Sequence, residues 1–440
     1  MSILPQVAFL IILVVTGIIL YKRVSFLKKS ILLGKPETRN DRPAERWRIM
    51  WLVAFGQKKM FKKLIPAILH LYIYASFIII NLEVLEFIID GLTGSHRSFA
   101  PYAGWFYPLA MNFFEFLALL VLVACVAFLV RRNITKVPRL STPELKGWPA
   151  LDANIILLTE IVLMCAILTM NATDQMLAER DYPSYVTVDH LLLSGLIIPL
   201  FEGLDTSSLV FIERFAWWFH IVGILGFAVY ITYSKHLHIF LAFPNTWYTD
   251  LKPRGEMKNM PAVTNEVNLM LGTASEPSAE SAEISRFGAK DVNDLSWANL
   301  LNAFSCTECG RCTAECPANI TGKKLSPRKI MMDTRDRAEE VTKSMLAGGP
   351  GFNDGKSLLH DYITKEEINA CTSCNACVEA CPVNIDPLSI ILELRRYAAM
   401  EESSSPAQWN AMFQNMETSF SPWKFSPSDR FNWAEQLKEE

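Results

Sequence analysis

Long apolar stretches alternate with basic, polar segments over the first half of the chain, whereas the second half is polar throughout. Five of the stretches are long enough to cross a bilayer as helices, which takes about 20 apolar residues. A sixth run, Leu191–Leu200, is too short to span and is predicted to be interfacial or re-entrant. The pattern therefore predicts a membrane domain followed by a soluble domain. The five predicted spans are approximately Ile3–Leu20, Leu64–Ile89, Phe106–Val130, Leu151–Met170 and Ile212–Tyr233.

Lysine and arginine are distributed unevenly among the segments that connect these spans. The segment 21–63 holds thirteen of them and 131–146 holds five, whereas the two loops on the opposite side hold one each, Arg97 and Arg180. By the positive-inside rule the N-terminus lies outside and the polar half lies in the cytoplasm. We therefore expect a multi-pass protein of the bacterial inner membrane whose soluble domain is cytoplasmic.

The chain of 440 residues divides into four predicted parts. Residues 1–243 form the membrane domain, and 244–286 form a linker because this segment is rich in Pro, Glu, Ser and Ala. A compact domain follows over 287–400, and 401–440 form a C-terminal tail. The formal net charge is −3, so the composition gives no indication of a nucleic-acid partner.

Eight of the ten cysteines belong to two copies of one motif, in which three cysteines at steps of three precede a fourth cysteine and a proline. In two-cluster ferredoxins the fourth cysteine of such a run binds the other cluster. Zinc and disulfides are the alternatives, but zinc sites rarely repeat such a run and disulfides need an oxidising compartment. The spacing thus predicts one [4Fe–4S] cluster on Cys306, Cys309, Cys312 and Cys381, and a second on Cys371, Cys374, Cys377 and Cys316.

Three histidines in or beside the predicted spans are candidate metal ligands. His70 lies near the cytoplasmic end of the second span, His220 in the outer half of the fifth, and His238 at the cytoplasmic end of the fifth. Positions 220 and 238 are eighteen residues apart, or five full helical turns, so they share one helix face about 27 Å apart, and His236 lies off that face. Ionisable groups in spans are usually functional. We predict that His70 and His238 bind haem and that His220 is a candidate for a second haem; simple hydrogen bonding at the interface is the alternative.

Acidic residues within the spans are costly in lipid and therefore need an explanation. Glu83 and Glu86, on the second span, are candidates for quinone binding or proton exchange. The alternative is that they lie near the outer interface and face water. For Glu115, on the third span, we expect the latter.

The helices, the spacing of His220 and His238, and the stretch Ser234–Ile239 resemble the gamma (cytochrome b) subunit of respiratory nitrate reductase, a module also found in the membrane subunit of heterodisulfide reductase. The resemblance implies that His70 and His238 hold the haem b on the cytoplasmic side. It also implies that His220 holds an outer haem, whose second ligand in the family falls here at Ile80. That ligand is therefore missing from its usual position, so the resemblance implies one or two haems.

The soluble half resembles the dicluster, ferredoxin-like subunit of heterodisulfide reductase. The stretches Leu251–Gly255, Cys306–Cys312 and Gly322–Pro327 resemble, more closely, membrane iron–sulfur oxidoreductases that take electrons from electron-transfer flavoprotein. The stretch Ser421–Ala434 resembles the segment that leads, in those longer proteins, into a cysteine-rich CCG domain. The resemblance implies a CCG-domain iron–sulfur protein, or a similar cytoplasmic redox subunit, as partner, with electron-transfer flavoprotein as a further candidate.

Together these features predict a mainly α protein, with a five-helix transmembrane cytochrome b domain followed by a helical bis-[4Fe–4S] ferredoxin-like domain. The predicted function is that of an electron-transfer subunit between a cytoplasmic partner and membrane quinone. No GxGxxG flavin motif appears, so substrate chemistry is expected on a partner. A heterodisulfide or thiol reductase-type complex is one alternative, and a cluster-bearing transporter or sensor is another, although the spans lack paired Gly/Pro-broken helices.

Overall fold

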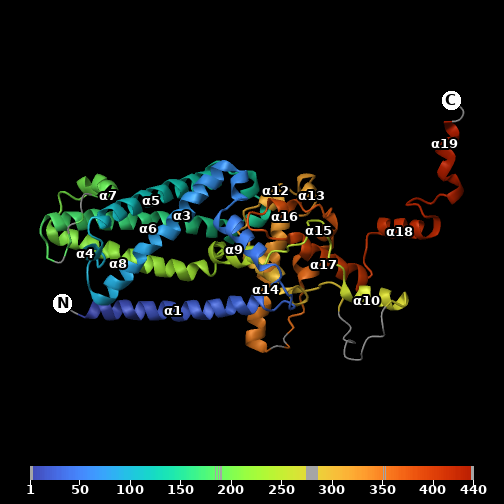
Figure 1. Cartoon of the computed structure of the whole chain (residues 1–440), viewed down its shortest axis with the longest axis horizontal. Helices are drawn as coiled ribbons and strands as arrows, with labels where there is room; N and C mark the ends of the chain where they lie inside the picture. The colour runs from blue at the N-terminus through green and yellow to red at the C-terminus, as the bar shows by residue number, and fades with distance from the viewer. Residues whose placement is uncertain are drawn as a thin grey trace.

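The computed structural model describes residues 3–183, 185–186, 188, 191–273, 286–349, 351 and 353–437. Over these residues the chain is mainly helical and contains no β-strand (Figure 1). Five helices are long and apolar enough to cross a membrane, which confirms the predicted fold class. They are α1 (Leu4–Ile31), α3 (Leu64–Thr93), α5 (Phe106–Leu129), α6 (Trp148–Glu179) and α8 (Thr206–Ile231).

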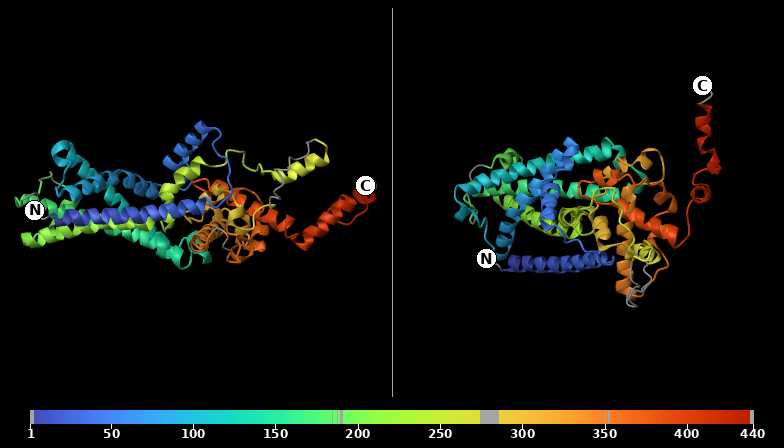
Figure 2. Two further views of the ribbon diagram at one scale, coloured as in Figure 1. Left: turned by 90° about the horizontal axis from the view of Figure 1, so that it is seen from below. Right: turned by 45° about the vertical axis from the view of Figure 1, so that its right-hand side comes forward.

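The membrane helices form an elongated bundle in which α6 packs against both α5 and α8, and α3 packs against α5. Helix α1 lies along the side of this bundle and contacts α3 and α8 (Figures 1 and 2). Its inward side chain Phe9 is fully buried against Phe87 and Trp217. A side chain at Gly91 would lie 2.5 Å from the Phe9 ring, so glycine permits the close approach of α1 and α3. Other α1 residues, such as Leu10 and Val14, are exposed, as lipid-facing positions are.

The predicted short segment is confirmed as too short to span, because α7 covers only Leu192–Ile197. Helix α7 packs against α5 and α6. Glu115 accepts hydrogen bonds from the backbone N–H groups of Leu193 and Ser194, both at 3.1 Å, and is only 3% exposed. The prediction that Glu115 faces water is therefore wrong, because the segment after α6 folds back over its carboxylate.

The fifth membrane helix does not continue to His238, as a shared face for His220 and His238 would require. Helix α8 ends at Ile231, a 3-10 turn covers Lys235–Leu237, and α9 runs from His238 to Trp247. Ser234 has an extended backbone, and its side chain accepts a hydrogen bond from the N–H of His236, which caps the new helical turn. The two histidines therefore lie on different helices, and the prediction of a shared helix face is wrong.

Helix α9 also crosses the predicted boundary between residues 243 and 244. Asn245 and Thr246 are buried, and the amide of Asn245 donates to the carbonyl of Val383 at 2.7 Å. The first part of the predicted linker is therefore packed helix, and α10 (Pro261–Met270) follows further along. Residues 274–285 of the predicted linker lie outside the described residues.

The cysteine-bearing domain lies at the end of the bundle that is opposite to the N-terminus (Figure 1). One continuous apolar core joins the two, since Leu27, Phe227 and Leu237 of the membrane half pack with Leu300 and Ile391 of the other. The remaining helices are α2 (Pro43–Met50), α4 (Ala100–Ala103), α11 (Trp297–Phe304), α12 (Arg311–Ala314), α13 (Pro317–Ile320), α14 (Pro327–Gly348), α15 (Lys365–Ala370), α16 (Ala376–Ala380), α17 (Pro387–Met400), α18 (Ala407–Ser419) and α19 (Asn432–Gln436).

The segment after α1 is held against the cysteine-bearing domain by its backbone. The N–H of Lys35 donates to the carbonyl of Leu295 at 2.7 Å, and the N–H of Trp297 donates to the carbonyl of Lys35 at 3.1 Å. A Cβ atom at Gly34 would lie 2.5 Å from the backbone of Ser296, so a side chain there would separate the two segments. These backbone contacts fix the position of the cysteine-bearing domain relative to the membrane helices.

Candidate functional site

The first cysteine run and the last cysteine of the second run meet around one cavity. Cys306, Cys309, Cys312 and Cys381 line this cavity, whose volume is about 390 Å³. The loop closes tightly because Gly310 has φ +70°, and a Cβ atom there would lie 2.4 Å from Nη1 of Arg328. The structure thus brings together the four cysteines that the spacing assigns to one cluster. We call this location site 1.

The other four cysteines gather at a second location, site 2. Burial raises the pKa of Cys371, and the neighbouring thiols of Cys316 and Cys374 raise it further. Burial and nearby groups, among them Cys371 and Cys316, likewise raise the pKa of Cys377. Cys316 therefore lies with the second run rather than with its own. Cys374 is exposed, so site 2 reaches the protein surface.

The donor groups at site 1 fit an iron–sulfur cluster. Burial raises the pKa of Cys306 to about 12 and that of Cys381 to about 11, so these thiols need a bound metal in order to ionise. Among the described residues, no three His, Cys, Asp or Glu side chains converge closely enough to hold a single metal ion. Four thiols around a shared cavity therefore suit a cluster better than one zinc ion.

Two of the candidate haem ligands face each other. The ring centres of His70 and His238 are 6.3 Å apart. A metal between two imidazole nitrogens, each about 2 Å away, would place the ring centres about 6 Å apart. Nδ1 of His70 lies 3.2 Å from Oε1 of Gln57, and Nδ1 of His238 lies 3.1 Å from the carbonyl oxygen of Lys235. Both Nδ1 atoms can donate to these oxygens, which leaves Nε2 for a metal, so the pair fits a bis-histidine haem.

His220 has a different environment. It is 1% exposed, its Nδ1 lies 3.0 Å from the carbonyl oxygen of Leu163, and its ring packs 5.6 Å from that of Phe87. Ile80, the position at which the resemblance expects a second ligand, packs with apolar residues of α5 and α6. Within the described part of the chain, no other histidine ring contacts His220. The structure thus brings His70 and His238 together but leaves His220 without a partner of that kind.

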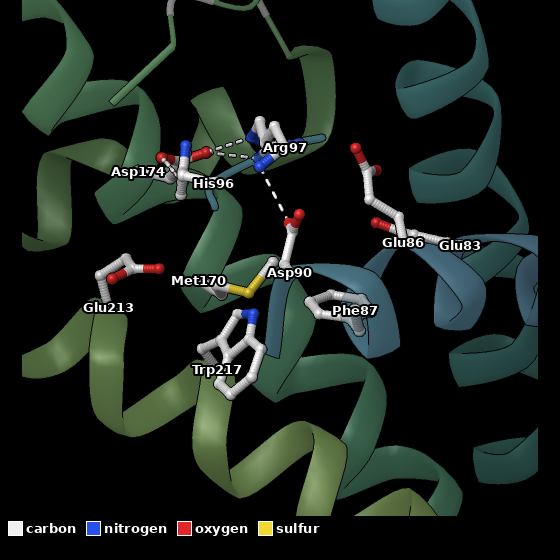
Figure 3. Close-up of a pocket in the computed structure, with 10 residues that line it drawn as sticks. All are labelled: Glu83, Glu86, Phe87, Asp90, His96, Arg97, Met170, Asp174, Glu213 and Trp217. Atoms are coloured by element: carbon white, nitrogen blue, oxygen red, sulfur yellow. Dashed lines mark hydrogen bonds and ion pairs between the residues drawn. The ribbon is translucent and has the colours of Figure 1, made fainter. Parts of the chain in front are cut away.

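A polar cavity of about 310 Å³ lies at the opposite end of the bundle, where Phe9 of α1 packs against Phe87 and Trp217. Figure 3 shows the side chains that line it. Both acids proposed from the sequence, Glu83 and Glu86, line it and are buried. The carboxylate of Glu86 accepts hydrogen bonds from the hydroxyl of Tyr107 and the N–H of Phe99, both at 2.8 Å. The two acids therefore do not simply face water. The full lining is Glu83, Glu86, Phe87, Asp90, His96, Arg97, Met170, Asp174, Glu213 and Trp217.

Sequence reasoning missed five of the titratable residues in this outer cavity, Asp90, His96, Arg97, Asp174 and Glu213. Arg97 is 5% exposed, pairs with Asp174 and donates to the side chain of Asn171 at 3.0 Å. Nε2 of His96 lies 2.9 Å from the carboxylate of Asp174. In the sequence Arg97 is only a topology signal, and Asp174 lies beyond the predicted end of its span. The available signal was that Arg97 and Asp174 carry opposite charges and each follows the outer end of a predicted span.

The outer cavity also holds buried polar atoms without a partner. Within the described residues, Oε2 of Glu83 and Nδ1 of His96 have no hydrogen-bond partner. The rings of Phe87 and Trp217 and the side chain of Met170 form the apolar part of the lining (Figure 3). Apolar walls with a few convergent polar groups are typical of sites for small organic ligands.

Comparisons with known proteins agree with the cysteine geometry. Residues 305–385 match the family described as the 4Fe-4S dicluster domain. The chain is 28% identical, over 97% of its length, to a probable iron-sulfur-binding oxidoreductase, FadF, of Bacillus subtilis, and 27% identical, over 92%, to an EtfAB:quinone oxidoreductase of Syntrophomonas wolfei. The matches cover 61% and 56% of those two proteins, so the chain spans about three fifths of their length.

The soluble half has further relatives. Over 23% of the chain and 49% of the relative, it is 35% identical to one subunit of a ferredoxin/F(420)H(2)-dependent CoB-CoM heterodisulfide reductase of Methanosarcina acetivorans. No solved structure matches the chain. The chain therefore combines five candidate membrane helices with a 4Fe–4S dicluster domain, and its relatives are iron–sulfur oxidoreductases and subunits of electron-transfer complexes.

Proposed function

We propose that this chain is the electron-transfer subunit of a membrane complex that passes electrons between a cytoplasmic redox partner and quinone, through two [4Fe–4S] clusters and haem b. The observation that carries the proposal is the order of the candidate sites along the molecule. Site 2 reaches the surface at Cys374, site 1 faces the membrane domain, the His70–His238 pair lies in that domain, and the outer cavity lies at its far end.

The loops of site 1 contact the membrane domain through three basic side chains. The Lys59 ammonium group donates to the carbonyl of Cys381 at 3.0 Å, and Arg139 donates to the carbonyl of Cys309. Lys235, whose carbonyl accepts from His238, also pairs with Glu308 in the first cysteine loop. One residue thus contacts both a candidate haem ligand and the loop of site 1, which supports direct transfer between the two cofactors.

The clusters and the haem would supply one-electron transfer, and the protein would supply their spacing and surroundings. In the outer cavity, Glu83, Glu86 and His96 would hold a quinone head group and exchange its protons. His220 lies between the two ends and remains a candidate ligand of a second haem. Similarity to an EtfAB:quinone oxidoreductase supports quinone as the substrate, and the roles of individual residues are our own proposal.

The partner is proposed by chemistry and by similarity. Exposed Cys374 marks the place where a soluble redox protein would approach site 2, and electron-transfer flavoprotein or a CCG-domain protein fits that role. The proposed orientation places residues 287–400 and the tail 401–440 in the cytoplasm of a bacterium, the N-terminus outside, and residues 1–243 in the inner membrane.

A thiol or heterodisulfide reductase-type complex is the second candidate. The observation that favours it is the similarity of the soluble half to one subunit of a CoB-CoM heterodisulfide reductase. In that case the same two clusters would carry electrons to or from a disulfide on a partner subunit rather than a flavoprotein.

The full-length chain, tagged and reconstituted in lipid nanodiscs under anaerobic conditions, tests the proposal. Reduced electron-transfer flavoprotein should reduce the clusters, then the haem, and then a menaquinone analogue. The control is the same preparation without the flavoprotein. Absence of haem from the purified protein, or cluster reoxidation by a disulfide substrate and not by quinone, would reject the quinone-linked role.

A further inference from the structure

Among the described residues, three basic side chains without a carboxylate partner lie at the loops of site 1, and two of them come from the membrane domain. Arg328 also lines the site but pairs with Glu144. Lys59, in the segment before α3, donates from Nζ to the carbonyls of Cys381 (3.0 Å) and Val378 (3.3 Å) and to Oδ1 of Asn384 (2.9 Å). Arg139, between α5 and α6, donates to the carbonyl of Cys309. In the sequence these two membrane-domain loops are only topology signals, yet their cations reach the loops that carry the cluster ligands.

The third cation belongs to the cysteine run itself. Arg311, which lies between Cys309 and Cys312, is 5% exposed and donates to the carbonyl of Lys59 at 3.4 Å. It therefore lies directly against the membrane-domain segment that carries Lys59. Site 1 is thus enclosed by positive charge from its own loop and from two membrane-domain loops.

None of these three cations is neutralised by a carboxylate in the described part of the chain. Every hydrogen bond that the structure gives to Lys59, Arg139 and Arg311 ends on a neutral oxygen. Lys235, at the same face, differs because it pairs with the carboxylate of Glu308. Removing a cation from water without an anion is unfavourable. An iron–sulfur cluster with four thiolate ligands carries net negative charge and would supply the missing anion here.

Site 2 has a weaker positive environment. Arg395 is the cation at its loop that donates to neutral oxygens, namely the carbonyls of Ile368 (2.7 Å), Asn369 (3.2 Å) and Cys371. Lys62 and Arg254 also lie beside the second run, but both pair with the carboxylate of Glu379. Cys374 is exposed, so solvent screens charges there more effectively than at site 1. The two sites therefore have matched ligands but different electrostatic surroundings.

We propose that Lys59 and Arg139 hold the reduction potential of the site 1 cluster above that of the site 2 cluster. Reduction adds one negative charge to a cluster, so a nearby cation that lacks a carboxylate partner favours the reduced form. The membrane domain thereby makes the cluster next to it the electron acceptor of the pair, and electrons run from site 2 to site 1. The proposal rests on the cysteine assignment of the proposed function and not on its quinone step. Lys59 and Arg139 are positioning residues in this role, since neither is a ligand.

The test is a redox titration of the purified full-length chain, followed by electron paramagnetic resonance. Lys59→Met and Arg139→Met should each lower the midpoint potential of the site 1 cluster, and the double variant should lower it further, with the site 2 cluster unchanged. Lys58→Met and Lys136→Met, exposed neighbours in the same two loops, are matched controls and should shift neither cluster. Cys374→Ser identifies the site 2 signal.

Two further variants separate charge from structure. Lys59→Gln keeps an N–H donor for the carbonyl of Cys381 but removes the charge. It should therefore lower the site 1 potential as Lys59→Met does, and it provides the measurement if Lys59→Met loses iron. Lys59→Arg should retain the wild-type potential. Three outcomes would overturn the proposal. The site 1 potential could stay unchanged in both Lys59→Gln and Arg139→Met, the potentials of both clusters could shift equally, or the control variants could shift the site 1 potential as much. The titration needs neither quinone nor partner, so it can fail or succeed independently of the quinone-linked function.

Discussion

The imidazole ring of His70, on α3, lies 6.3 Å from that of His238, the first residue of α9, and the two rings are inclined by 46°. Each Nδ1 faces an oxygen, on Gln57 for His70 and on Lys235 for His238. Such hydrogen bonds fix the tautomer of a metal-ligating histidine and orient its ring. The pair is therefore arranged as two ligands of one metal, although it comes from segments far apart in the chain.

Replacing either His70 or His238 with Ala should remove a low-spin haem b signal and leave the clusters in place, because each haem iron needs both axial ligands to stay low-spin. Gln57→Leu should weaken haem retention by about 10- to 100-fold, the usual effect of removing a hydrogen bond behind a ligand. The measurement is the visible and electron paramagnetic resonance spectrum of the purified protein. His236→Ala is the matched control. The His236 ring lies 5.5 Å from that of His238 but is nearly perpendicular to it, at 87°, so we do not assign it as a haem ligand. A full haem spectrum in both alanine variants would contradict the assignment.

The cluster prediction concerns metal content. The anaerobically purified chain should contain about eight iron and eight acid-labile sulfide, as expected for two four-iron clusters. Cys377→Ala should lower this content by about half, because Cys377 is buried at site 2 and is one of its four predicted ligands. Cys165→Ala, a cysteine within α6 and outside both motifs, should retain all of the iron. Stoichiometric zinc with little iron would exclude the assignment.

Features that depend on residues close in sequence were predictable, whereas features that depend on distant contacts were not. The spans and the cysteine runs were readable because each depends on residues close in sequence: continuous apolar stretches, or cysteines at steps of three. The break between α8 and α9 was not, since Tyr233 and Ser234 carry no Pro or Gly to mark it. The helix restarts because Ser234 caps the N–H of His236, and that turn is what brings His238 opposite His70.

The outer cavity shows the limit of sequence reasoning most clearly. Arg97 and Asp174 are separated by 77 positions and pair only after the loop that follows α3 has met the end of α6. A single sequence gives no signal for such a pairing. Glu83 and Glu86 were singled out because charges are rare inside spans, but their partners, such as Tyr107, follow from the fold and not from the pattern.

Replacing Glu83 with Gln should slow quinone reduction by at least about 10-fold while leaving reduction of the haem by the clusters unchanged. The reason is that Oε2 of Glu83 is buried in the outer cavity and has no hydrogen-bond partner among the described residues. Proton transfer by a positioned side chain typically contributes about 10²–10⁴-fold. The measurement is steady-state quinone reduction combined with stopped-flow haem reduction. Glu179→Gln, at the exposed end of α6, is the control. Equal slowing of both steps would place the effect elsewhere.

Arg23 should contribute to the attachment of α1 to the rest of the molecule. It is 8% exposed, its Nη2 lies 2.9 Å from Oε1 of Glu339 on α14, and its Nε donates to the carbonyl of Thr232 at 3.2 Å. Arg23→Met should cost about 2–3 kcal/mol, less than the loss of a fully buried pair because Glu339 is 23% exposed. Thermal unfolding in detergent measures this, and Lys22→Met, an exposed neighbour, should leave the midpoint unchanged. A midpoint equal to wild type in Arg23→Met would contradict the prediction.

The C-terminal tail exposes aromatic side chains that the fold does not use. Helices α18 and α19 project away from the body of the molecule (Figure 1). The exposed fractions are 72% for Phe420, 68% for Trp423, 61% for Phe425, 70% for Phe431 and 63% for Trp433. The contacts of this segment are internal, such as the donation from Arg430 to the carbonyl of Phe420 at 2.6 Å. This arrangement favours a docking segment over one that packs back onto the cluster domain, because exposed apolar clusters commonly mark interaction sites.

Deleting the residues from Ser421 onward should therefore leave both clusters in place but abolish co-purification of the redox partner, which we expect to be a CCG-domain protein. Donor-driven quinone reduction should fall to the level without partner, whereas chemical reduction of the clusters by dithionite should be unaffected. Replacing Trp423 and Trp433 with Ser in the intact chain tests the aromatic surface without shortening it, and replacing the exposed Gln414 and Glu417 with Ala on α18 serves as the control. Loss of the clusters in the truncated chain would mean that the tail stabilises its own domain. Unchanged partner affinity in both the truncated and the tryptophan variants would show that the partner binds elsewhere, with the exposed face around Cys374 as the next surface to examine.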